Sequence, residues 1–98
     1  MTVRDFCGII RGDYVYVLRP EYSNEGPMSI ETIWNRYLYK LAGKFYKDGF
    51  ENIKIYEDDE KNLKNKDLLK IYTREEVEST EVSWIETTYD SDFLVHTK

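Results

Sequence analysis

The 98-residue sequence has little of several residue types, and each shortage excludes a class of protein. A single cysteine, Cys7, excludes an internal disulfide framework, and with a single histidine, His96, it supplies too few ligands for a zinc site. No apolar run approaches the ~20 residues of a transmembrane helix, and the N-terminus lacks the apolar stretch of a secretory signal. We therefore expect one cytoplasmic domain over residues 1–98, with no membrane contact, metal or cofactor.

The sequence also lacks the patterns of common catalytic sites. Neither GxGxxG nor GxxxxGK, the glycine-rich phosphate-binding patterns, occurs. Cys7 falls on an apolar stripe, so we expect no Cys7–His96 nucleophile pair and interpret His96 as a partly exposed strand residue. The acid run at 57–60 lacks the glycine and spacing of a calcium-binding loop, which favours a solvated loop. We therefore expect that the protein is not an enzyme.

Charge and aromatic rings are abundant. Charged residues make up 34% of the chain and aromatic residues 15%, and the net charge is −5. Residues 1–50 carry seven bases and six acids, whereas residues 51–98 carry thirteen acids and seven bases. Such asymmetry steers the approach of partners more than it determines a fold. Tyrosine and tryptophan suit both a core and an interface, because they supply large contact area at small entropic cost.

The first twenty residues predict a short helix followed by a strand. Thr2 is a suitable N-cap, and Asp5 at the third helical position comes close to a capping box. The helix presents one apolar face, formed by Val3, Phe6, Cys7 and Ile10, and Gly12 is its expected stop. The next segment, DYVYVLR at 13–19, is rich in Tyr and Val on both faces. It predicts a central strand that Pro20 ends.

Residues 30–47 predict one long amphipathic helix after the N-cap Ser29. Its apolar positions keep a period near 3.6 residues: Ile30, Ile33, Trp34, Tyr37, Leu38, Leu41 and Phe45. Gly49 suits the left-handed position after a helix, which would bring Phe45 against Phe50. Gly43 could instead divide the helix, but the continuous apolar stripe favours a single one.

The remaining chain predicts two hairpins. Apolar and polar side chains alternate in the same pattern in residues 52–57 and 68–73. This pattern predicts two antiparallel strands joined by a charged loop. Residues 80–88 and 93–97 predict a second pair. Between the hairpins, the segment from Thr73 to Glu76 fits either a capping box that opens one helical turn or a turn between strands.

The order of elements predicts the fold class. Two helices and a late run of strands indicate an α+β fold with a mostly antiparallel sheet of four to five strands. The long amphipathic helix would pack on this sheet, beside the short N-terminal helix. In the strand at 80–88, alternation would place Val82, Trp84 and Glu86 on one face.

The acids near the C-terminus suggest a surface for a partner. Seven acids and no base occur between residues 75 and 92. Alternate side chains on a strand lie about 6.6–6.8 Å apart, close to the spacing of backbone phosphates, so such carboxylates could occupy a basic nucleic-acid-binding groove. The residues assigned to partner binding are Glu75, Glu76, Glu78, Glu81, Glu86, Asp90 and Asp92.

The bases of the expected long helix suggest an alternative. Spacings of four, four and three residues would align Arg36, Lys40, Lys44 and Lys47 on one helix face. With Tyr39 and Tyr46 among them, these cations could bind a nucleic acid or a nucleotide. The competing interpretation is an ordinary solvated helix face, and the net charge of −5 argues against a general nucleic-acid binder.

The first seventeen residues, MTVRDFCGIIRGDYVYV, resemble the opening of small accessory proteins encoded by phages and mobile elements of Gram-positive bacteria. The resemblance implies a binding protein, and some members of that group, the anti-CRISPR proteins among them, inhibit host defence nucleases. It transfers no individual functional residue. The leading hypothesis is therefore a non-enzymatic, protein-binding inhibitor of a nuclease in the host cytoplasm, as a monomer or homodimer. Nucleic-acid binding is the alternative.

Overall fold

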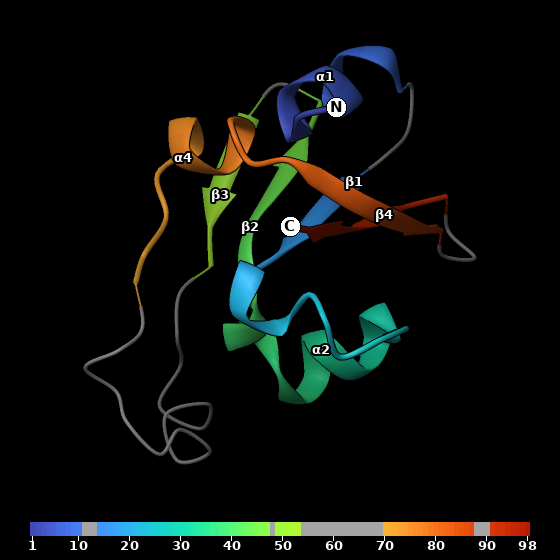
Figure 1. The fold of residues 1–98 in the computed structure, drawn as a ribbon. Coiled ribbons are helices and arrows are strands. Elements are labelled where there is room, and N and C mark those ends of the chain that lie inside the picture. The colour runs from blue at the N-terminus through green and yellow to red at the C-terminus, as the bar shows by residue number, and fades with distance from the viewer. Residues whose placement is uncertain (11–13, 48, 54–69, 88–90) are drawn as a thin grey trace.

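A computed structural model describes residues 1–10, 14–47, 49–53, 70–87 and 91–98 (Figure 1). A five-stranded sheet in the order β3-β2-β1-β5-β4 forms its centre. The strands are β1 (Tyr14–Leu18), β2 (Leu41–Tyr46), β3 (Gly49–Asn52), β4 (Val82–Thr87) and β5 (Phe93–Thr97). The helices are α1 (Val3–Ile9), α2 (Ile30–Arg36) and α4 (Arg74–Glu78), and the 3₁₀ turns are η1 (Pro20–Tyr22) and η2 (Leu38–Lys40).

The sheet is mixed. β1 lies in the middle, as its sequence predicts, antiparallel to β2 and parallel to β5. The pairs β2/β3 and β4/β5 are antiparallel, the latter as predicted. The parallel pair arises because the chain leaves β1 for the β2/β3 side and returns to its other side only after α4 and β4. The α+β class is confirmed, with a mixed sheet in place of the simpler antiparallel one.

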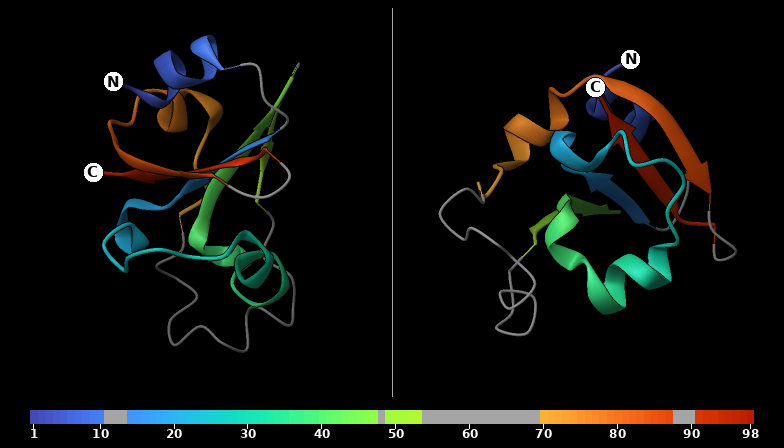
Figure 2. Two further views of the ribbon diagram at one scale, coloured as in Figure 1. Left: turned by 90° about the vertical axis from the view of Figure 1, so that its right-hand side faces the viewer. Right: turned by 60° about the horizontal axis from the view of Figure 1, so that its bottom comes forward.

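The two faces of the sheet bury separate apolar clusters. On one face Val15, Val17 and Phe45 pack with α1 and α4. On the other, Leu18, Leu41 and Leu94 pack with α2 and η2. Figure 2 shows α1 and α4 on one side of the sheet and α2 on the other. Because alternate residues of a strand face opposite ways, the Tyr/Val-rich β1 supplies both clusters.

The long helix predicted over 30–47 is wrong. Helix α2 begins after its N-cap Ser29, as predicted, but ends at Arg36. The turn η2 and strand β2 follow. β2 lies between β1 and β3 and is covered on both faces, so it buries consecutive residues, including Leu41 and Ala42. A doubly buried strand has no clean two-residue alternation, and its apolar run resembles a buried helix.

The predicted contact between Phe45 and Phe50 exists but has another cause. The two residues face each other across the β2/β3 pair, with ring centroids 4.8 Å apart. Gly49 therefore opens a strand and does not cap a helix. Gly43 lies under Phe50: a β-carbon built there would come within 2.2 Å of a Phe50 ring carbon. The glycine is needed for this close approach.

Capping boxes begin both α1 and α4, which decides the open choice at Thr73 in favour of a helical turn. In α1 the Thr2 hydroxyl accepts from the Asp5 amide, and the Asp5 carboxylate accepts from the Thr2 amide. Thr73 and Glu76 form the same exchange at the start of α4. The expected stop Gly12 lies outside the described residues. No helix in the described part of the chain has the length and apolarity needed to cross a membrane.

The first predicted hairpin differs from the structure. Strand β3 ends at Asn52, and residues 70–73 of the second expected strand are not in a strand. The rest of that hairpin and the acid run at 57–60 lie outside the described residues.

In β4 the register shifts between Val82 and Trp84, so Val82 packs with the α1-side cluster. The expectation that Val82 shares a face with Trp84 and Glu86 is wrong, because a bulge adds one residue there.

Candidate interaction surface

Five side chains form a cluster that we call the aromatic face. They come from three elements: Tyr14 and Tyr16 from β1, Lys44 and Tyr46 from β2, and Trp34 from α2. The strand register places Tyr14 opposite Tyr46 and Tyr16 opposite Lys44. These residues lie on the same side of the sheet as α2, beyond the part that α2 covers with its buried residue Ile33.

The rings of the aromatic face contact one another and surround the lysine. Tyr14 lies edge-on to Tyr46, with centroids 6.5 Å apart, and Tyr16 lies edge-on to Trp34 at 6.2 Å. The Lys44 ammonium lies 4.3 Å from the Tyr14 centroid and 5.3 Å from that of Trp34. It is also within 6 Å of Tyr16 and Tyr46. Cation–π attraction to several rings holds the cluster together.

Much of this aromatic surface is in contact with water. Trp34 is 50% exposed, Tyr14 40% and Tyr46 39%, whereas Tyr16 is buried beneath them. Burial raises the pKa of the Tyr16 hydroxyl, and the nearby Asp92 carboxylate raises it further. Within the described residues Lys44 makes no ion pair with a carboxylate. The aromatic face thus combines exposed rings with one cation that a partner can reach.

The sequence pattern indicates only part of this surface. It marks Lys44 and Tyr46 but predicts a helix there, and it predicts that Trp34 belongs to the core stripe of that helix. The alternation of Tyr14 and Tyr16 in β1 was a usable signal for a shared face. The pairing of β1 with β2, which adds Lys44 and Tyr46, is a tertiary fact that local periodicity does not contain.

The predicted basic helix face does not exist, because its four residues belong to four different segments. Arg36 ends α2, Lys40 ends η2, Lys44 lies in β2, and Lys47 lies in the turn after it. Lys40 pairs with Glu25 at 2.6 Å and lies 4.9 Å from the Tyr37 ring centroid. This pair lines a cavity of about 280 Å³ between α2 and the segment before it. Only Lys44 joins the aromatic face.

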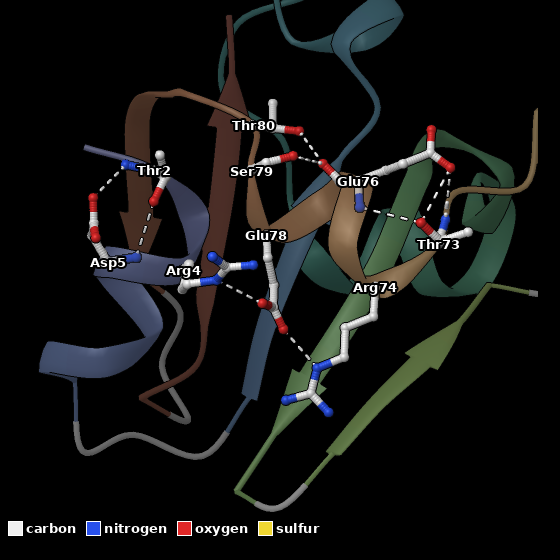
Figure 3. A network of polar contacts seen from close by, with 9 residues as sticks. All are labelled: Thr2, Arg4, Asp5, Thr73, Arg74, Glu76, Glu78, Ser79 and Thr80. Carbon is white, nitrogen blue, oxygen red and sulfur yellow. Dashed lines mark hydrogen bonds and ion pairs between the residues drawn. The ribbon is translucent and has the colours of Figure 1, made fainter.

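Among the described residues, the acids assigned to partner binding lie in or beside α4, β4 and β5, and most have partners within the chain. Figure 3 shows two of them, Glu76 and Glu78, with some of their partners. Glu76 completes the α4 capping box and pairs with Lys70. Glu78 lies between Arg74, at 2.6 Å, and Arg4, at 2.8 Å. Both acids therefore stabilise the position of α4. Glu75, in the first turn of α4, is exposed and forms no side-chain ion pair among the described residues.

The other assigned acids lie away from α4. Glu81 pairs with the N-terminal amine at 3.2 Å, and Asp92 accepts a hydrogen bond from the Tyr14 amide at 3.1 Å. Glu86 points inward, toward His96. Asp90 lies outside the described residues. The structure therefore does not gather these acids into one cluster, and it places Asp92 beside the aromatic face.

Three acids of α1 and α4, two of them in capping boxes, are stabilised in their ionised form. Hydrogen bonds from Thr2 lower the pKa of Asp5, and that from Lys70 lowers the pKa of Glu76. The pKa of Glu78 is lowered by its hydrogen bonds with Arg74 and Arg4. A lowered native pKa adds stability above the pKa of the unfolded chain, and this stability is lost as pH falls through the native value. These acids therefore contribute to the stability of the native state at neutral pH.

His96 and Cys7 lie on opposite faces of the sheet. His96 shares a face with Leu94 and is fully buried, so the expectation of partial exposure is wrong. Its Nε2 lies 2.5 Å from Glu86, its Nδ1 lies 3.2 Å from the Ser23 carbonyl, and Trp84 stacks on it at 3.8 Å. Cys7 packs against the cluster on the α1 side. The two side chains are thus not a pair.

Cys7 is expected to react slowly in the folded protein. Burial, with a smaller contribution from Glu78, raises the pKa of its thiol from 9.0 to about 11. At pH 8 the reactive thiolate is then about 100-fold scarcer than in the unfolded chain. Alkylation by iodoacetamide at pH 8, compared with and without urea, measures this ratio. Equal rates in the two conditions would contradict the burial of the thiol.

Comparison with known proteins adds no relative. The chain matches no protein-family model, no curated protein and no solved structure. In the described segments, no three His, Cys, Asp or Glu side chains come together in a way that could hold a metal ion.

Proposed function

We propose that this protein is a non-enzymatic binding module that contacts a protein partner through its aromatic face. The observation that carries the proposal is the exposure of Tyr14, Trp34 and Tyr46 around Lys44. Tyr and Trp are enriched at the centres of protein interfaces, where each buries large area with few rotatable bonds. Exposed rings gathered in one patch are typical of an interaction site.

The charges around the patch favour a protein over a nucleic acid. A phosphate backbone is bound by several bases at once, whereas the aromatic face contains one lysine. Asp92 lies close enough to raise the Tyr16 pKa, and Glu51 is the cross-strand neighbour of Lys44. Both acids would repel phosphates. The net charge of −5 acts in the same direction.

A narrower form of the proposal is inhibition of a host defence nuclease, in the manner of anti-CRISPR proteins. Here the acidic half of the chain would steer the module toward a basic nucleic-acid-binding surface, and the aromatic face would provide the lasting contact. What supports it is the charge asymmetry of the sequence and the exposed position of Glu75. The internal pairing of Glu76 and Glu78 limits how far the α4 acids can act as a phosphate mimic.

The test begins with a protein captured from a host lysate and then purified for affinity measurement. Replacing Tyr14 and Tyr46 together by serine is expected to weaken its binding at least tenfold, because the two main exposed tyrosines of the patch are lost. The matched control replaces Ile9 and Ile71 by serine, since these side chains are 69% and 65% exposed but lie outside the patch. This control should bind as the wild type does.

Two further measurements separate nuclease inhibition and nucleic-acid binding from the general protein-binding proposal. In the narrower proposal Glu75→Lys lowers the association rate at low salt but not at high salt, because steering is screened by ions. Equal loss of binding in the tyrosine variant and the isoleucine control would overturn the aromatic face as the contact. If instead oligonucleotides bind in a salt-sensitive way that Lys44→Gln abolishes, the protein-binding proposal fails in favour of nucleic-acid binding.

A further inference from the structure

A cavity of about 280 Å³ lies between α2 and the segment that precedes it. Ile33 of α2 is buried, and the lining residues Met28 and Tyr37 are half-buried. The cavity therefore has a partly apolar inner end at Ile33 and opens to solvent. Its volume lies near the lower limit of about 300 Å³ for ligand pockets, so it suits a small molecule. Other lining residues are exposed and surround the entrance: Glu25, Pro27, Ser29 and Thr32.

An ion pair forms part of the cavity wall. Lys40 Nζ lies 2.6 Å from a carboxylate oxygen of Glu25, and both residues line the cavity. The side chain of Lys40 is 16% exposed and that of Glu25 is 45% exposed. The ring centroids of Tyr22 and Tyr37 lie 5.2 and 4.9 Å from the ammonium and help to hold it in place. An ammonium has three N–H donors and a carboxylate has two oxygens, so one mutual contact leaves each group with capacity to bind a ligand.

The segment at the entrance of the cavity is held at both ends. The Ser23 carbonyl lies 3.2 Å from Nδ1 of the buried His96. The Met28 amide donates a hydrogen bond to the Glu86 carboxylate at 3.1 Å. Between these two contacts Gly26 has a φ of 86°, a left-handed conformation that favours glycine. A site whose walls are already held loses less entropy when it binds a ligand.

We propose that this cavity binds a free α-amino acid with an apolar side chain. The carboxylate of the ligand accepts hydrogen bonds from Lys40, and its ammonium donates to Glu25. The four charges then alternate around a ring, and the ion pair of the protein stays closed. The apolar side chain of the ligand lies against Ile33 and Met28, where it leaves water. The cavity shares no residue with the aromatic face, so the two proposals stand or fall separately.

The charge balance of the lining favours a zwitterion over a simple ion. The lining contains one base, Lys40, and one acid, Glu25. A lone carboxylate is attracted by the lysine but repelled by the glutamate, and a lone ammonium meets the reverse, whereas a zwitterion is attracted by both. An uncharged apolar molecule would displace water from both charges and offer no polar contact in return. The lining therefore selects a ligand that carries one charge of each sign.

The first test titrates the ¹⁵N-labelled wild-type protein with L-leucine at pH 7, where the amino acid is a zwitterion. We expect the backbone amide resonances of Thr32 and Ile33, which line the cavity, to shift in a saturable way with a Kd on the order of millimolar. Gly8 in α1, on the other face of the sheet, is the internal reference and should not shift. If leucine gives no saturable shift at Thr32 and Ile33, the site is overturned.

Three analogues of leucine test the ligand class on the same wild-type protein. N-acetylleucine lacks the ammonium and leucinamide lacks the carboxylate, so we expect each to bind about tenfold more weakly than leucine. Glycine keeps both charges but has no side chain to bury, and it should also bind more weakly. Equal binding of leucine and either singly charged analogue would overturn the choice of a zwitterion. Equal binding of leucine and glycine would overturn the apolar contact at Ile33.

A pair of variants tests the role assigned to Glu25. Glu25→Gln removes the charge that binds the ligand ammonium, so we expect it to weaken leucine binding about tenfold. The matched control is Glu31→Gln, because Glu31 is an exposed acid of α2 that does not line the cavity. This control should bind leucine as the wild type does. The amide spectrum of each variant without leucine verifies the fold, and equal effects of the two substitutions would overturn the assignment of Glu25.

Discussion

Gly43→Ala is expected to lower the free energy of unfolding by about 1–3 kcal/mol, although only one methyl group is added. The new β-carbon would come within 2.2 Å of the Phe50 ring, which packs against Phe45 with a centroid separation of 4.8 Å. The ring must therefore leave its place on β2. A helix through this region predicts the opposite sign, because alanine replaces glycine in a helix interior with a gain of about 0.5–1 kcal/mol.

Gly8→Ala is the matched control. Gly8 lies in α1, and a β-carbon built there meets no atom within 4 Å. We expect this variant to be more stable than the wild type by about 0.5–1 kcal/mol. Urea unfolding followed by circular dichroism compares the three proteins. A Gly43→Ala variant as stable as the wild type, or more so, would contradict the β2/β3 hairpin.

The second large effect is expected at Glu86. Its carboxylate lies 2.5 Å from His96 Nε2 and also accepts from the Met28 amide, at 3.1 Å. Glu86→Leu would leave the fully buried His96 and this amide without their acceptor. Removing one partner of a buried polar pair costs about 3–5 kcal/mol, a large share of the roughly 5–15 kcal/mol that stabilises a typical domain.

Glu86→Gln separates the polar contacts from the charge. Its amide oxygen can still accept from Met28, so we expect a loss of only about 1–2 kcal/mol. Chemical denaturation of both variants gives the comparison. Hydrogen exchange of the Met28 amide provides a second reading, because protection should persist in the glutamine variant. Equal stability of the leucine variant and the wild type would show that the Glu86–His96 contact contributes nothing.

The position of Glu86 explains why charge in the sequence was a poor guide to the surface. An acid in a β-rich segment is ordinarily solvated, and nothing nearby in the sequence marks Glu86 as the partner of His96. The pairing requires β4 beside β5, and it requires the segment at Ser23 and Met28 to cross over them. Only long-range contacts bring these groups together.

The aromatic face likewise depends on long-range contacts that local sequence patterns do not reveal. A stripe with a period near 3.6 residues fits Ile30, Ile33 and Trp34, and there it correctly predicts α2. The stripe continues by coincidence through Leu41 and Phe45, because β2 buries residues on both of its faces. Sheet pairing then outweighs local preference. The cluster around Lys44 exists only because that pairing places β2 beside β1.

What the sequence by itself determined were the features that depend on neighbours a few residues away. These are the N-caps at Thr2 and Ser29, the strand after α1 and the β4/β5 hairpin, whereas the segment at Thr73 fitted both a helical turn and a turn between strands. Tertiary structure alone decided the end of α2, the parallel pairing of β1 with β5, and the environments of Lys44 and His96. Caps and turns are satisfied by local hydrogen bonds, whereas strand partners and counterions come from distant parts of the chain.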